Sequence, residues 1–181
     1  MKKHAIVAAC LLAATPALAQ SLSEKSGLNT LVGASPSTAD FVKEAAVSDM
    51  FEIQSSQLAS ERGDDATKTF AKQMITDHQK TSGEMKGMVQ GGKVQAGLPT
   101  ELDGTHQGKL DKLKGLQGAD FTKQYHSDQV KAHKDAVDLF QRYAKGGDNA
   151  DLKAWAGKTE PALAHHLQMA QDLDKSGAAS R

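Results

Sequence analysis

Apolar side chains recur at alternating spacings of four and three residues along four segments of the chain. This spacing places them on one face of an α-helix, and such a face is buried where helices pack against one another. We predict helices over about residues 38–62, 64–90, 119–145 and 148–175. The second helix has one of the longest such faces, which consists of Thr67, Ala71, Met74, His78, Thr81, Met85 and Met88.

The connections between these segments indicate how the helices are arranged. Ser37 or Thr38 can cap the first helix, which stops at Gly63, and a short link to the next helix makes the two antiparallel neighbours. The third and fourth helices are joined equally briefly at Gly146-Gly147. Residues 91–118 form a long connection with an amphipathic piece over about 106–116, and this connection either crosses from one end to the other or forms a long surface loop. Because no strand pattern competes, we predict an all-α, ferritin-like four-helix bundle whose long second connection contains a short helix.

Each predicted buried face carries one titratable residue near its centre: Glu52, His78, His133 and His166. At about 1.5 Å per residue, Glu52 and His78 differ in height by roughly one turn, and His133 and His166 lie within about two turns. One carboxylate and three imidazoles can therefore converge. This donor set suits a single Zn, Mn, Fe or Cu ion, so we predict these four residues as metal ligands.

Two other interpretations of the same residues stand beside this one. A hydrogen-bonded Glu–His network that only supports the core would produce the same pattern. A ferritin-like di-iron site needs Glu-x-x-His on two helices, but Ile75 and Leu163 stand three residues before the histidines of the second and fourth helices, so di-iron chemistry is disfavoured. The methionines of the second helix are interpreted as core filler.

Several neighbouring residues have weaker predicted roles. Asp77 can support the site from outside the ligand set, and Tyr125 is expected in the core with a bonded hydroxyl. We expect His126 and His165 at the surface. Pro161 either kinks the fourth helix about one turn before its histidine or is merely tolerated there.

The N-terminus has the pattern of an export signal. Two lysines precede an apolar run that is too short to span a bilayer, and Ala17-Leu18-Ala19 forms a cleavage site. We predict a signal peptide over residues 1–19, a flexible leader over 20–37, the helical domain over 38–175 and a disordered tail over 176–181. The protein is then periplasmic or secreted; the alternative is a lipoprotein anchored at Cys10.

Composition narrows the possible functions. Basic and acidic residues number 22 each and form no block of like charge, so nothing indicates a nucleic-acid partner. Cys10 is the only cysteine, and after cleavage no thiolate remains for disulfides or catalysis. No serine-centred elbow motif appears either, which disfavours a nucleophilic hydrolase and favours a protein that is not an enzyme.

The chain also resembles a known family. The matching motifs are F-V-x-E-A-A-x-S-D-M-F-E-I from Phe41, M-I-x-D-H at Met74–His78, L-P-x-x-L from Leu98, F-x-x-x-Y from Phe121, A-H at Ala132–His133 and P-A-L-x-x-H-L from Pro161. Together they resemble a domain-of-unknown-function family of exported bacterial proteins, often described as outer-membrane or periplasmic and placed among ferritin-like bundles. The resemblance implies a ferritin-like bundle and an exported location. It also implies that the family's candidate site consists of Glu52, His78, His133 and His166.

Two functions follow from these observations. The first is an exported helical protein that binds one transition metal in its core, for metal handling or envelope stress. The second is an interaction module of the cell envelope whose polar core is structural, with an envelope protein as its partner. The mature chain is expected to contain no transmembrane helix.

Overall fold

The computed structural model describes residues 33–179, and this part of the chain folds into five helices without a strand. They are α3 (Thr38–Arg62), α4 (Asp65–Gln90), α5 (Gly104–Gly115), α6 (Gly118–Gly146) and α7 (Ala150–Ala179). The predicted all-α class is therefore confirmed.

Short polar side chains start the first three helices. Ser37, Asp64 and Asp103 each accept a hydrogen bond from the backbone N–H three residues later, which satisfies one of the free donors at a helix start. Helix α6 instead begins at Gly118, where φ is +53°, a conformation that favours glycine. These local signals explain why the observed helix boundaries lie close to those predicted from sequence.

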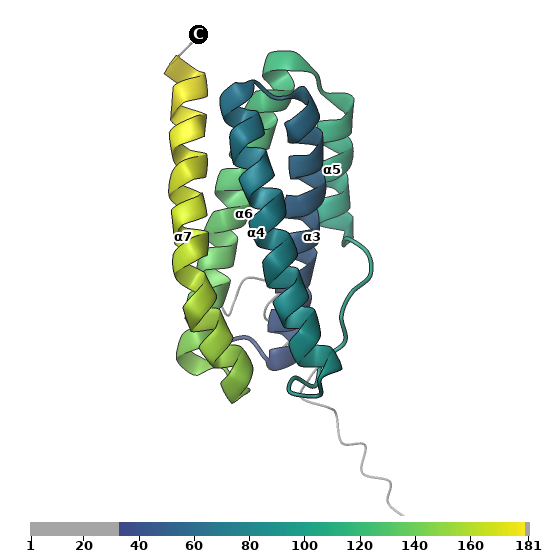
Figure 1. Cartoon of the computed structure of the whole chain (residues 1–181), viewed down its shortest axis with the longest axis vertical. Helices are drawn as coiled ribbons and strands as arrows, with labels where there is room; N and C mark the ends of the chain where they lie inside the picture. Colours follow the sequence, from purple (N-terminus) through teal and green to yellow (C-terminus); the bar gives the residue numbers. More distant parts are fainter. Residues whose placement is uncertain (1–32, 180–181) are drawn as a thin grey trace, which may run out of the picture.

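The four long helices lie side by side, and consecutive ones form the hairpins α3–α4 and α6–α7 (Figure 1). The two hairpins pack against each other, with α3 in contact with α6 and α4 in contact with α7. The connection after α4 runs back along the outside, and its short helix α5 lies against α3 (Figure 1). Helix α7 passes through Pro161 as one continuous helix.

Two apolar clusters make up the core. One contains Phe41, Phe140 and Tyr143, with Trp155 packed at its edge. The other contains Phe51, Phe70, Met74, Phe121 and Tyr125, together with Leu110 and Leu113 from α5. Along α4, α6 and α7, the buried residues His78, His133 and His166 fall between members of these two clusters. No helix in the described part of the chain is long and apolar enough to cross a membrane.

The structure corrects the inner end of the predicted leader. Pro36 is buried, and Arg142 donates a hydrogen bond of 2.9 Å to the carbonyl oxygen of Ala34. Residues 34–37 are thus held against α6, and a flexible leader does not extend through them. The predicted signal peptide, the lipoprotein site at Cys10 and residues 20–32 lie outside the described residues.

The predicted tail boundary at Ser176 is too early, since α7 continues through Ala179. Ser176 donates to the carbonyl oxygen of Leu173 at 2.9 Å, and Gly177 lies against the ring of His126 on α6. A packed neighbour thus extends α7 beyond the last residue of its apolar pattern. Residues 180–181 lie outside the described part.

Candidate metal centre

Three buried histidines from three helices converge halfway along the packed helices. His78 on α4, His133 on α6 and His166 on α7 are 1–4% exposed. Their ring centroids lie 5.5–5.7 Å apart in each of the three pairs. Each ring offers one nitrogen, and the three nitrogens lie within 4.8 Å of one another. This is the arrangement from which three imidazoles can bind one ion.

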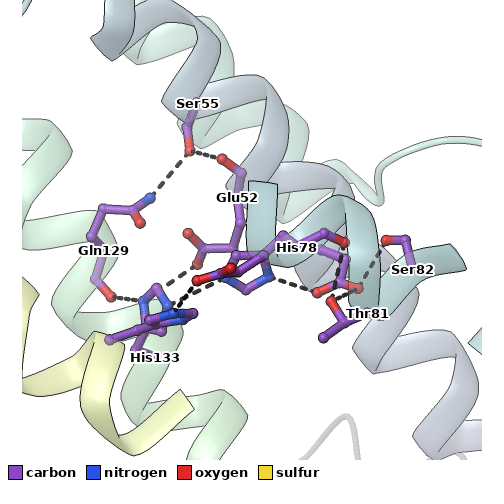
Figure 2. A network of polar contacts seen from close by, with 10 residues as sticks. Glu52, Ser55, His78, Thr81, Ser82, Gln129 and His133 are labelled. Atoms are coloured by element: carbon purple, nitrogen blue, oxygen red, sulfur yellow. Dashed lines mark hydrogen bonds and ion pairs between the residues drawn. The ribbon is translucent and has the colours of Figure 1, made fainter. Parts of the chain in front are cut away.

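His78 is held by a carboxylate that the sequence analysis did not select. Its Nδ1 lies 2.7 Å from Oδ1 of Asp49, a buried residue on α3. The other oxygen of Asp49 accepts hydrogen bonds from Thr81 at 2.9 Å and Ser82 at 2.8 Å (Figure 2). Asp49 thus fixes the orientation of His78, and it leaves Nε2 of that ring facing the other histidines.

His133 is held by its own helix. Its Nδ1 lies 3.0 Å from the carbonyl oxygen of Gln129, one turn earlier on α6 (Figure 2). Its Nε2 lies 3.4 Å from Nε2 of His78. For comparison, two nitrogens bound at about 2.1 Å to one tetrahedral zinc lie about 3.4 Å apart.

His166 is held by Asp77, the residue that precedes His78 on α4. Its Nε2 lies 2.9 Å from Oδ2 of Asp77. Its Nδ1 is buried and has no hydrogen-bond partner among the described residues. The supporting role suggested for Asp77 from the sequence therefore matches this contact.

The three rings share one pattern. In each, one nitrogen contacts a carboxylate or a backbone carbonyl, which leaves the other nitrogen as the one that can bind an ion. Metal-binding histidines almost always have such an outer partner, because it fixes the tautomer and the ring orientation. The ring of His166 shows the pattern most plainly, since its second nitrogen is left unpartnered.

Glu52 is buried beside the three histidines without being a member of their close group. Its Oε1 lies 3.9 Å from Nδ1 of His133. Neither carboxylate oxygen has a hydrogen-bond partner among the described residues, and neither does Oε1 of nearby Gln129. A buried carboxylate without donors is costly, so Glu52 must carry a proton or meet a donor or cation.

With this geometry established, comparison with known proteins assigns the chain to a family. A family model described as a domain of unknown function, DUF4142, matches residues 19–173. The chain belongs to the DUF4142 family. The resemblance stated from sequence motifs to a domain-of-unknown-function family is thereby confirmed. Searches of curated proteins and of solved structures gave no match.

Burial sets the charge states in this DUF4142 site. It raises the pKa of Glu52 to about 7, against the opposing charge of His78, and it lowers the pKa of His133 to about 3, helped by the charge of His78. Burial and the charge of His78 also lower the pKa of His166. Burial alone would lower the pKa of His78. The hydrogen bond and charge of Asp49, together with the charges of Glu52 and Asp77, outweigh burial and raise that pKa. The site therefore offers two neutral imidazoles beside one that is easily protonated.

Other sequence-based expectations have mixed outcomes in this DUF4142 chain. Tyr125 is buried, and its hydroxyl contacts Ser56 Oγ at 2.9 Å, away from the histidines. His165 is exposed as expected. The surface position expected for His126 is wrong: it is 4% exposed, its Nε2 lies 2.8 Å from Thr67 Oγ1 of α4, and Gly177 of α7 lies beside its ring.

Asp49 and Gln129 are the residues that the sequence analysis missed. Asp49 lies three residues before Glu52, and Gln129 lies four before His133, so each shares a helix face with a selected residue. That spacing was the available signal. A pattern of one titratable residue for each helix does not select Asp49 or Gln129.

Proposed function

We propose that this protein binds a single transition metal ion in its core through His78, His133 and His166, with Glu52 as a further ligand. The observation that carries the proposal is the convergence of the three buried rings, each anchored at one nitrogen by a neighbouring group. A set of three imidazoles and one carboxylate suits Zn, Mn, Fe or Cu. Such an ion would also supply the cation that the unpartnered oxygens of Glu52 lack.

The wider context of the proposal is an exported protein for metal handling or envelope stress. The N-terminal signal pattern supports export, and the long return connection after α4 supports a ferritin-like four-helix bundle. Neither a thiol nor a serine nucleophile motif supports hydrolysis in the predicted mature chain, so we propose no catalytic residue.

Metal analysis of protein purified without chelator tests this proposal. We expect about one ion per chain, and saturation at about 100 times the dissociation constant should add about 2.7 kcal/mol to the free energy of unfolding. The substitution His78→Ala should abolish both the bound metal and this gain. Substitution of the exposed neighbour of a ligand, His165→Ala, is the matched control and should change neither.

Metal-free protein that shows no thermal shift with Zn, Mn, Fe or Cu would refute the proposal. It would favour the second candidate, an envelope interaction module with a structural polar core. That candidate is supported by the 3.4 Å contact between His78 and His133, which can be a hydrogen bond between two imidazoles without any ion. In that case His78→Ala should lower stability whether or not metal is present, since it leaves Oδ1 of the buried Asp49 without the donor it contacts.

A further inference from the structure

A pocket of about 190 Å³ opens between α4 and α7 directly beside the histidines. His78 and His166 belong to its wall, so two of the three converging rings border a space connected to solvent. The rest of the wall consists of Asp77, Lys80, Thr81, Glu84, Lys158, Thr159, Ala162 and Leu163. The candidate metal centre is therefore buried between the helices and bordered by this pocket on one side.

The pocket lies at the interface between α4 and α7. Side-chain hydrogen bonds cross this interface from Asp77 to His166 and from Trp155 to Glu84, at 2.9 and 2.8 Å. Small side chains lie between these two contacts, including Thr159 and Ala162 of α7. The hydrogen bonds hold the helices at a fixed separation, and the small residues leave the space between them open.

The wall of the pocket carries two lysines and two carboxylates, so its own formal charge is balanced. Lys80 and Lys158 are exposed, one from each helix, whereas Asp77 contacts His166 and Glu84 accepts from Trp155. A metal ion held by the histidines would therefore make the pocket attractive to an anion, because opposite charges interact more strongly in a partly buried site than in water.

We propose that this pocket admits a small monovalent anion to a metal ion held by the three histidines. The inference rests on the proposed metal site and adds that the site exchanges a ligand with solvent. Three imidazoles leave a tetrahedral ion one open position. Where Glu52 fills that position, the anion would enter as a fifth ligand, since zinc sites with an exchangeable position can expand to five. In a closed structural site, protein side chains would instead occupy every coordination position of the ion.

Azide binding to the Co²⁺-loaded protein tests the inference. Azide is a monovalent anion that fits the pocket, and the visible absorption of Co²⁺ responds to a change in its ligands. We expect a saturable spectral change in the wild type. Filling the pocket by Ala162→Phe should weaken azide binding about tenfold or more, a loss of about 1.4 kcal/mol or more, while Co²⁺ affinity stays unchanged.

The control places the same bulky residue elsewhere on α7. Ala154 is exposed and is not in the pocket wall, so Ala154→Phe should bind azide like the wild type. The double substitution Lys80→Gln and Lys158→Gln is a second test that leaves the pocket open. It should weaken azide binding several-fold and reduce the dependence of that binding on salt.

The outcomes separate this inference from the proposed function. If Co²⁺ binds but azide leaves its spectrum unchanged, the metal site stands and the exchangeable position is refuted. If azide binds equally to the wild type, Ala162→Phe and the double lysine variant, the pocket is not its route and the inference is overturned. If Co²⁺ does not bind at all, the proposed metal site itself fails.

Discussion

The aromatic cluster around Phe41 and the histidine layer around His78 are built on the same four long helices and hold them together in different ways. Phe41 stacks on Tyr143 with ring centroids 4.1 Å apart and meets Phe140 edge-on at 4.9 Å. These contacts need only apolar surface and a suitable shape. The histidine layer is equally buried, but its stability depends on a partner for each polar atom. The comparison teaches that burial alone does not distinguish a region that supports the fold from one suited to bind an ion.

The substitution Phe41→Ala should cause the largest loss of stability. Phe41 is fully buried, so its removal leaves a cavity and should lower the free energy of unfolding by about 3–5 kcal/mol. Urea unfolding with and without metal checks this. The stabilisation by metal should remain as in the wild type, and a loss of that response would show that the two regions are not separate.

The substitution Asp49→Asn should have the next largest effect and should act on both stability and metal binding. Asp49 contacts three donors, and an amide nitrogen in place of one oxygen leaves at least one of them without an acceptor. We expect a loss of about 2 kcal/mol in metal-free protein and a loss of about 10–100-fold in metal affinity.

Metal titration and urea unfolding measure the two effects. Asp135→Asn is the matched control, because Asp135 is an exposed residue paired only with Lys131 on its own helix. This control should differ little from the wild type. Unchanged metal affinity in Asp49→Asn would show that the orientation of His78 does not depend on the carboxylate.

The pH dependence of stability should reveal a smaller, opposing pair of effects in the histidine layer. With its pKa raised to about 7, folded Glu52 keeps a proton that the unfolded chain releases above about pH 4.5. Its contribution to stability is therefore present at low pH and is lost as pH rises through 7. With its pKa lowered to about 3, His133 does the reverse, and its contribution is lost as pH falls below about 6.5.

The substitution Glu52→Gln should separate the pH-dependent contribution of Glu52 from that of His133. Between about pH 4.5 and 6.5 the two contributions oppose each other in the wild type. Without Glu52, the free energy of unfolding of metal-free protein should fall more steeply as pH is lowered, by up to about 1.4 kcal/mol per pH unit. Urea unfolding at several pH values in the presence of a chelator measures this pH dependence. Glu61 is exposed, so Glu61→Gln is the control. Parallel curves for the wild type and Glu52→Gln would contradict the assignment.

The sequence predicted much of the helical fold because its signals are local. Helix faces, capping residues and glycine stops act within a few residues, so the predicted boundaries of α3 and α4 agree closely with the structure. The convergence of His78, His133 and His166 was also predictable, since equal depth on neighbouring helices brings residues together.

The remaining features depend on contacts between distant segments. His126 is buried where Thr67 of α4 and Gly177 of α7 lie beside its ring, and Asp49 joins the site through three donors that α4 presents to it. Likewise, the pocket beside the site exists because of small residues on α7 opposite α4. Helical periodicity within one segment carries no information about which residues a second segment places opposite.

The division of the three histidines between the hairpins has a consequence for the order in which the chain is made. Helices α3 and α4 leave the ribosome first and carry only His78 of the three, whereas α6 and α7 supply His133 and His166 much later. A chain interrupted after α4 therefore carries only Glu52 and His78 of the four proposed ligands. Under the proposed function, such a truncated product would hold a metal ion less tightly than a chain that includes α6 and α7.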